Sequence, residues 1–301
     1  MKITGNYNGQ KLVVALGFFD SVHKGHRELV AQTVALAKKL DAKPAVFTFS
    51  GNPYFVKDDK RGVVLTFDER VALLLEIGVD FVISAQPTPQ FFGGSPKEFL
   101  DSLCTSFDVA GFTSGTDYSF GKNAEGNVEY LQSYCAEKGI AFSSVSLVKM
   151  DGKKIATRDI AALIEQGRVD DAAAELGYGY FLQGTVLAGR GEGKRNSVPT
   201  VNLDITPGKV VPKRGVYATE TEIDGKVFSS VTNVGAHPTY QDFTENVETF
   251  VLDFDGDVYG KTVKVSFKKF LREVQTFSSP CELRAQIGKD AEASRGAQWK
   301  I

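Results

Sequence analysis

Residues 12–26 read LVVALGFFDSVHKGH and decide the fold of the first half of the chain. The apolar run 12–19 has the length of a strand and the composition of one buried on both faces. A helical pattern follows at once, with Val30, Val34 and Ala37 on one face. A strand that leads directly into a helix is the unit from which parallel sheets are built.

The same alternation of strand and helix patterns continues to about residue 150. The strand-like runs PAVFTF, DFVISA, VAGFTSG and AFSSVSLV are separated by helical patterns such as FDERVALLLEIG and NVEYLQSYCAEKG. Strict alternation predicts an α/β domain with a doubly wound parallel sheet. A further helical run, 160–176, ends at Gly177, which is a suitable C-cap.

Beyond residue 180 the chain is rich in strands. Asp-Gly pairs at 224–225 and 255–256 lie between strand-like runs, which predicts hairpin turns. Several strands followed by one C-terminal helix predict a small antiparallel β-barrel. We therefore expect two domains, 1–180 and 181–301, and a length of 301 residues also favours two cores.

The composition, with 42% hydrophobic and 24% charged residues, is that of an ordinary globular protein. A formal net charge of −2 gives no basis for binding nucleic acid or a membrane surface. We find no signal segment, no membrane-spanning apolar run and no C-x-x-C motif among the three cysteines, so we expect a cytoplasmic protein. Small basic spots at Lys153, Lys154, Lys194 and Arg195 suit a phosphate ligand.

The first candidate site lies where the first strand meets the first helix. His23 and His26, two of the three histidines of the chain, flank Gly25 there. Ligands bind at such strand ends, and a helix N-terminus offers N–H groups and a positive dipole end to an anion. This arrangement suits attack on a nucleotide α-phosphate with release of pyrophosphate. An H-x-x-H pair is also half of a metal site, but no third ligand cluster accompanies it.

The second candidate site opens the strand-rich half. A Gly-rich loop with Gly189, Gly193 and Lys194 suits phosphate oxygens. Thr200 and Asn202 lie two apart in an extended segment, so their oxygens point the same way and suit Mg²⁺ beside a nucleotide. Taken alone, this Pro-Thr-x-Asn segment is more typical of a plain turn into a strand.

The first half of the chain resembles the FAD synthetase half of the bacterial bifunctional riboflavin kinase/FAD synthetase family. GFFDSVHKGH (17–26) is similar to the G-x-F-D-x-V-H-x-G-H signature of nucleotidyltransferases, and TFSGNP (48–53) and GTDYSFGK (115–122) are similar to two later family segments. The resemblance implies that this domain converts FMN and ATP into FAD. It assigns catalysis to His23 and His26, ATP or phosphate contacts to Gly17, Phe18, Asp20 and Gly25, and flavin contacts to Asn52, Asp117 and Phe120.

The second half resembles the riboflavin kinases. GTVLAG (184–189), PTVN (199–202) and PKRGVY (212–217) occur in the order of that family. The resemblance implies phosphorylation of riboflavin to FMN with ATP and Mg²⁺, in an antiparallel barrel. It assigns the general base to Glu248, although periodicity alone does not choose between Glu248 and Glu245. It also assigns phosphate contacts to Gly189, Gly193 and Lys194, metal contacts to Thr200 and Asn202, and a flavin contact to Arg272.

One segment departs from the FAD synthetase pattern. The family carries I-S-S-T-x-I-R, and this chain reads IATRDIA (155–161), with alanines in place of the first serine and the arginine. Thr157 and Arg158 are the candidate replacements for binding ATP phosphates. Ser21 is a milder departure, because it stands where the family has glycine.

We therefore weigh three hypotheses. The favoured one is a bifunctional enzyme that makes FMN and then FAD. The second is a monofunctional riboflavin kinase with a weakened or nucleotide-binding-only N-terminal domain. The third is a flavin- or nucleotide-binding regulator, which the set Thr200, Asn202 and Glu248 disfavours because a pure binder needs no base. The sequence gives no indication of the oligomeric state.

Overall fold

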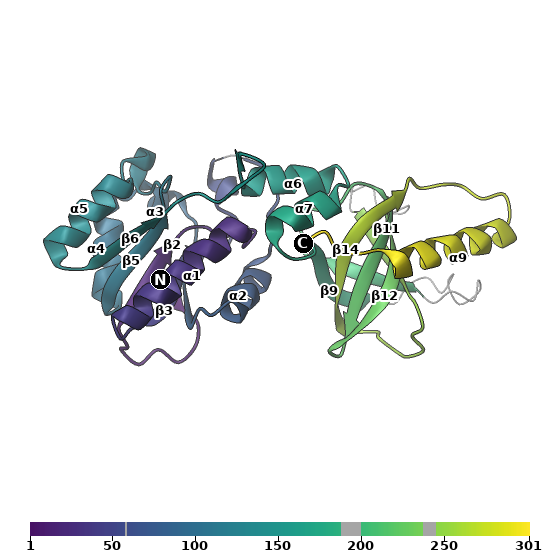
Figure 1. Cartoon of the computed structure of the whole chain (residues 1–301), viewed down its shortest axis with the longest axis horizontal. Helices are drawn as coiled ribbons and strands as arrows, with labels where there is room; N and C mark the ends of the chain where they lie inside the picture. Colours follow the sequence, from purple (N-terminus) through teal and green to yellow (C-terminus); the bar gives the residue numbers. More distant parts are fainter. Residues whose placement is uncertain (58, 188–199, 237–244) are drawn as a thin grey trace. The chain divides into compact units, whose positions relative to one another are not determined.

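The computed structural model describes residues 1–57, 59–187, 200–236 and 245–301 (Figure 1). The chain divides into two compact units, Met1–Thr157 and Arg158–Ile301, here called the sheet unit and the barrel unit. A six-stranded sheet forms the first unit and a closed antiparallel barrel with a C-terminal helix forms the second, so the expected fold class is confirmed.

The sheet of the first unit has the order β1-β4-β3-β2-β5-β6. Strands β2 to β6 are parallel, and only the short β1 pairs antiparallel, with β4. The order grows outward from β2 through β3 on one side and from β5 to β6 on the other. The carboxyl ends of β2 and β5 therefore flank the switch point, where α/β sheets bind ligands. The strands are β1 (Lys2–Ile3), β2 (Leu12–Leu16), β3 (Lys43–Phe49), β4 (Phe81–Ala85), β5 (Val109–Gly115) and β6 (Ala141–Val145).

Local polar residues start the helices of this unit. Capping boxes, Thr66 with Glu69 and Ser95 with Glu98, begin two of them, and each pair satisfies backbone N–H groups reciprocally. A two-stranded hairpin follows the sheet near the end of the unit. The elements are α1 (Lys24–Lys39), η1 (Pro53–Lys57), α2 (Phe67–Glu76), α3 (Pro89–Gly93), α4 (Pro96–Ser106), η2 (Lys122–Ala124), α5 (Val128–Lys138), β7 (Lys149–Met150) and β8 (Lys153–Lys154).

The barrel of the second unit closes in the order β10-β13-β12-β11-β14-β9. The Asp-Gly pair at 224–225 forms a tight hairpin turn, whereas the pair at 255–256 lies within a longer connection between β13 and β14. Helix α9 packs on β11 and β12 (Figure 1). The elements are α6 (Thr157–Glu165), α7 (Val169–Leu176), β9 (Phe181–Leu187), β10 (Thr200–Ile205), β11 (Gly215–Ile223), β12 (Lys226–Ala236), β13 (Glu245–Val251), β14 (Thr262–Arg272) and α9 (Pro280–Gly296).

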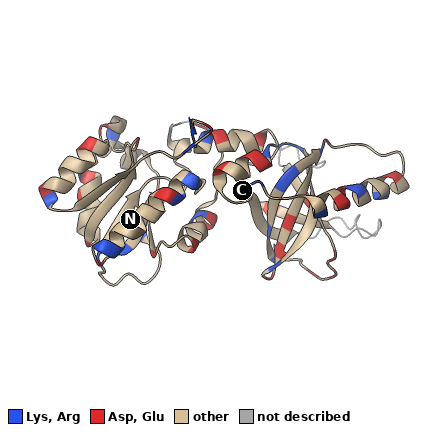
Figure 2. Ribbon diagram, viewed as in Figure 1, with Lys and Arg blue, Asp and Glu red and all other residues tan. Residues whose placement is uncertain are grey.

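Charge is mixed along the helices of both units. Acidic and basic residues are interspersed on α5 and α9 (Figure 2), in keeping with a formal net charge of −2. No helix among the described residues is long and apolar enough to cross a membrane.

The barrel unit begins at residue 158, whereas the sequence led us to expect a boundary near residue 180. Helix α7 packs on β14, the Lys213 N–H donates to Ile164 O at 3.3 Å, and Lys300 pairs with Asp171. The helices also contribute core residues, since six of their apolar side chains are 0% exposed: Ile160, Ile164, Val169, Ala172, Ala173 and Leu176.

A fragment of residues 158–301 should therefore be clearly more stable than one of residues 181–301. Removing α6 and α7 uncovers apolar surface of the barrel, and each buried side chain of this kind is worth about 1.5–3 kcal/mol. We expect the shorter fragment to unfold about 10 °C lower or more, as measured by thermal denaturation. Equal transition temperatures would show that the helices are dispensable and would favour a boundary near residue 180.

Candidate active sites

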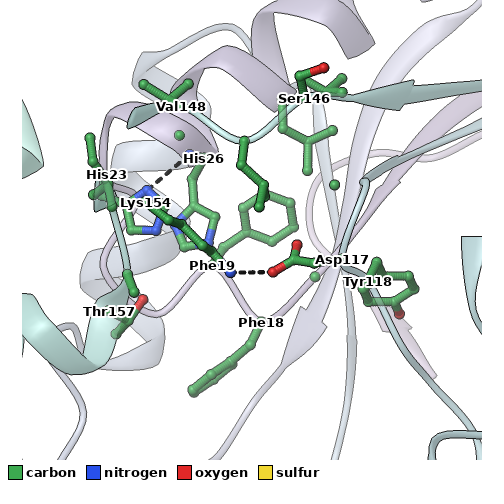
Figure 3. Close-up of a pocket in the computed structure, with 18 of the residues that line it drawn as sticks. Phe18, Phe19, His23, His26, Asp117, Tyr118, Ser146, Val148, Lys154 and Thr157 are labelled. Carbon is green, nitrogen blue, oxygen red and sulfur yellow. Dashed lines mark hydrogen bonds and ion pairs between the residues drawn. The ribbon is translucent and has the colours of Figure 1, made fainter. Parts of the chain in front are cut away.

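A cavity of about 290 Å³ lies at the carboxyl ends of β2 and β5, at the switch point of the sheet (Figure 3). We call it the histidine cavity. Four segments line it: the loop from β2 into α1, the loop after β5, residues 145–148 at the end of β6, and residues 154–157 at the end of the β7–β8 hairpin. Of the residues expected at the first site, Gly17, Phe18, His23, Gly25, His26, Asp117 and Thr157 line this cavity.

The loop from β2 into α1 is strained. Phe19 and Val22 have φ values of 56° and 41°, and a positive φ is uncommon for any residue except glycine and especially costly for a β-branched one. Both side chains are fully buried, which holds the loop in this conformation. Such strain is typical of sites where the backbone is positioned for a ligand.

His23 and His26 form a stacked pair, with ring centroids 3.7 Å apart and planes 8° apart. His23 is the N-cap of α1, and its Nδ1 accepts the His26 N–H at 3.1 Å. A neutral His23 therefore carries its proton on Nε2. A Cβ at Gly25 would lie 3.0 Å from His23 Cε1, which explains the glycine between the histidines. The buried His26 Nδ1 has no hydrogen-bond partner in the described structure.

Burial keeps both imidazoles neutral at pH 7. Desolvation is the main cause that lowers the pKa of His23 from 6.5 to about 4, although a backbone hydrogen bond opposes it. Desolvation also lowers the pKa of His26 well below 6.5, and the charges of Arg70 and Lys154 act in the same direction. The two side chains can therefore donate hydrogen bonds to a phosphate, but they do not act as resident cations.

The cavity also holds an ion pair that crosses it. Lys154, on β8, pairs with Asp117, which follows β5 (Figure 3). The resemblance implies a flavin contact for Asp117, and the structure places Asp117 in the lining of the histidine cavity, next to Tyr118 and Ser119, which line both cavities. The motifs gave no assignment for Lys154 beyond a basic spot.

Three residues expected at the first site do not line the cavities described here. The Asp20 carboxylate is buried and accepts backbone N–H groups before α2, such as that of Val64 at 3.0 Å. Asn52 is used within its own loop, where it accepts the Tyr54 N–H at 2.9 Å. Arg158 is exposed at the start of α6. Short polar side chains such as those of Asp20 and Asn52 stabilise a loop by accepting hydrogen bonds from its backbone N–H groups. This explains why these two residues are held away from the cavities.

An aromatic cavity of about 570 Å³ adjoins the histidine cavity in the sheet unit. The two share Gly17, Phe18, Tyr118 and Ser119. Tyr118 stacks on Phe120 with centroids 5.4 Å apart, as suits a slot for a planar ring. Motif analysis found Phe18 and Phe120 but missed most of the lining, which adds Phe47, Phe49, Phe91, Phe92 and Phe99.

A third cavity, of about 340 Å³, lies in the barrel unit between the strands and α9. Thr200 Oγ1 donates a hydrogen bond to Glu248 Oε1 at 2.6 Å. Glu248 lies opposite Asn202 of β10 on one side and opposite Asn233 of β12 on the other. Residues paired in an antiparallel sheet share a face, so all four polar side chains gather on one face.

Arg272 and Asn233 also belong to the polar part of this third cavity, as do Gln275, Arg284 and Asp290. Arg272 makes a two-pronged ion pair with Asp290 of α9, through Nη2 at 2.8 Å and Nε at 3.2 Å. Apolar residues such as Leu283 and Ile287 of α9 line the rest. The motifs give Asn233 no role, although an Asn-x-Gly sequence begins at this residue.

Three residues expected to contact phosphates at the second site lie outside the described residues: Gly189, Gly193 and Lys194. No group of three or more His, Cys, Asp or Glu residues that could hold a metal occurs within residues 1–57, 59–187, 200–236 and 245–301.

Comparison with known proteins agrees with this geometry. The FAD synthetase family model matches residues 6–159, and the riboflavin kinase family model matches residues 176–297. The bifunctional riboflavin kinase/FMN adenylyltransferase of Listeria monocytogenes is 31% identical over 293 residues, which cover 96% of this chain and 93% of the relative. The chain belongs to this bifunctional family.

Two further proteins are similar to this chain over nearly its whole length. The bifunctional enzyme of Bacillus subtilis is 28% identical, over 94% of this chain and 91% of the relative. A solved structure from Streptococcus pneumoniae, described as a macrolide-efflux protein, has a TM-score of 0.88 at 28% identity and covers 97% of this chain. Because both halves match, the comparisons confirm the bifunctional family assignment and do not favour the monofunctional alternative.

Proposed function

We propose that the barrel unit phosphorylates riboflavin to FMN and that the sheet unit adenylylates FMN to FAD, with ATP as the second substrate of both reactions. One observation carries the proposal: the family signature residues of each unit meet at a cavity. These are His23 and His26 in the sheet unit, and Thr200 and Glu248 in the barrel unit.

In the kinase reaction, Glu248 serves as general base. The Thr200 hydroxyl holds one carboxylate oxygen, which orients Glu248 toward the cavity. The carboxylate takes the proton of the riboflavin hydroxyl as that oxygen attacks the γ-phosphorus of ATP. The bond from the γ-phosphorus to the β,γ-bridging oxygen breaks, and ADP leaves with the electron pair on that oxygen. Oxygens of Thr200 and Asn202 are hard, neutral ligands of the kind that Mg²⁺ accepts beside phosphates. The ion would neutralise the negative charge of the ATP phosphates.

In the adenylyl transfer, the aromatic cavity holds the flavin ring and the histidine cavity holds the ATP phosphates. The two cavities adjoin, so the FMN phosphate can reach the α-phosphorus of ATP. His23 Nε2–H and the first N–H groups of α1 donate hydrogen bonds to the transferring group. The neutral state of the histidines suits donation without a competing buried charge.

Incubation of the whole chain with riboflavin, ATP and Mg²⁺ tests the proposal. Chromatography of the flavins should show FMN first and FAD later, and supplied FMN should give FAD directly. EDTA should stop FMN formation, since Mg²⁺ would be removed from the phosphates. FMN without FAD would support the monofunctional alternative, and binding without turnover would support a regulator.

The location proposed for this enzyme is the cytoplasm. Cys104, Cys135 and Cys281 are free thiols in the structure. Reduced cysteines are usual in the cytoplasm, where ATP is also available.

A further inference from the structure

Lys154 faces the histidine pair from a hairpin to which the motifs assign no function (Figure 3). We infer that Lys154 binds the β- and γ-phosphates of ATP in the sheet unit. It would thereby supply the positive charge that the family places at the end of the segment 155–161, where this chain has Ala161. The inference rests on the proposed adenylyl transfer and adds to it the residue that holds the leaving group.

The hairpin fixes the position of Lys154. Its turn residues Asp151 and Gly152 have φ values of 50° and 76°, as a tight two-residue turn between β7 and β8 requires. The next residue, Ile155, is 3% exposed, and its N–H donates to Val148 O at 3.2 Å. Lys154 therefore directly precedes Ile155, and the burial and the hydrogen bond of Ile155 fix the end of the hairpin at the cavity.

A hydroxyl pair ties the same segment to the loop before α1. Ser21 Oγ lies 2.9 Å from Thr157 Oγ1, a hydrogen bond between residues 136 positions apart in the sequence. Ser21 stands where the family has glycine, so this bond depends on a departure from the family pattern. The departure holds the segment that carries Lys154 next to the loop that carries His23.

The described lining of the histidine cavity offers one cationic side chain to the phosphates. Among the described residues that line it, Lys154 is the only one with a cationic side chain at neutral pH, because His23 and His26 are neutral. Arg158 is exposed and does not belong to the lining. The buried His26 Nδ1 without a partner is an independent sign that the cavity is built for a polar ligand.

Asp117 is the ion-pair partner of Lys154 in the structure. Their side chains are 44% and 48% exposed, and an ion pair with that exposure contributes little stability. The phosphates of ATP carry more charge and more acceptor oxygens than one carboxylate, so they can displace Asp117 from Lys154. An FMN phosphate oxygen then bonds to the α-phosphorus, the bond to the bridging oxygen breaks, and that oxygen leaves with the electron pair on pyrophosphate. Lys154 neutralises the charge that develops there.

The test compares Lys154→Met with Lys153→Met in the full-length chain. Lys153 lies on the same strand and is exposed, and it does not line the cavity, so both variants lose one charge from one hairpin. The rate of FAD formation from supplied FMN is measured against ATP concentration, and the reverse reaction is measured against pyrophosphate concentration.

We expect Lys154→Met to raise the KM for ATP and for pyrophosphate about tenfold or more, the worth of one charge-assisted hydrogen bond. The KM for FMN and the rate of FMN formation from riboflavin should not change, and Lys154→Arg should restore most of the loss. Wild-type values for ATP and pyrophosphate in Lys154→Met would overturn the inference. A rise in the KM for FMN as large as that in the KM for ATP would also overturn the inference. It would mean that the substitution changes the shape of the whole site and does not remove a contact to the ATP phosphates.

The same measurements separate this inference from the proposed function. Absence of FAD from the wild-type chain supplied with FMN, ATP and Mg²⁺ would overturn both. Brisk FAD formation together with a Lys154→Met variant that behaves like Lys153→Met would overturn the role of Lys154 alone.

Discussion

Replacement of Glu248 by Gln should lower the rate of FMN formation about 10²- to 10⁴-fold, the usual worth of a positioned general base. The amide keeps the shape of the side chain and can still accept the hydrogen bond from Thr200, which is 2.6 Å long in the structure. It cannot take the riboflavin proton. The loss should therefore appear in kcat, with little change in the KM for riboflavin.

Two controls isolate this effect. Glu222→Gln makes the same chemical change at an exposed position of β11 and should leave FMN formation unchanged. FAD formation from supplied FMN should also be unchanged in Glu248→Gln, because that reaction belongs to the other unit. Normal FMN formation by Glu248→Gln would remove Glu248 from the mechanism and direct attention to Glu245.

Most of the fold could be predicted because local patterns determine it. The apolar run at the start of β2 and the Asp-Gly turn at 224–225 each depend on a few neighbouring residues. The domain boundary could not be predicted in the same way. The apolar faces of α6 and α7 show that the helices pack on something, but the periodicity does not say whether that is the sheet or the barrel.

The candidate sites were predictable where one segment carries several functional residues. His23 and His26 share one helix start, and Thr200 and Asn202 share one strand. The aromatic cavity was largely missed, because its lining comes from β3, α3, α4 and the 118–124 loop, which meet only in the folded chain. The sequence shows Lys154 only as part of a basic spot, whereas the folded chain places it in the same cavity lining as His23 and His26 and pairs it with Asp117.

Replacement of either histidine should lower FAD formation about 10²- to 10³-fold and spare FMN formation, since one donor to the developing charge is worth about that much. His26→Ala removes a buried ring that stacks on His23 and contacts the Phe19 ring at a tilt, so it also leaves a void. His23→Asn is the sharper variant. Asn is a good N-cap and can still accept the His26 N–H, so α1 keeps its start while the imidazole donor is lost.

The pH dependence distinguishes catalysis by neutral histidine from catalysis by charged histidine. With the pKa of His23 at about 4, the neutral donor persists as the pH falls from 8 to about 5, so the rate of FAD formation should show no step near pH 6.5 that depends on His23. Stability should behave differently. Below pH 6.5 His23 binds a proton in the unfolded chain, whereas in the folded chain it binds one only near pH 4. The free energy of unfolding of the sheet unit therefore falls as the pH is lowered from 6.5 to 4.

That loss is about 1.4 kcal/mol for each pKa unit of difference between the folded and unfolded states. Thermal unfolding of the wild-type chain should therefore shift to lower temperature between pH 6.5 and 4. His23→Asn should reduce the shift, because asparagine does not titrate. A step near pH 6.5 that is present in the wild-type rate of FAD formation and absent from that of His23→Asn would contradict this account, since it would mean that the charged imidazole takes part. A step caused by the FMN phosphate, whose second pKa is about 6, would persist in the variant. An unchanged pH dependence of unfolding in His23→Asn would also contradict this account. A buried His23 with a lowered pKa must contribute to that dependence.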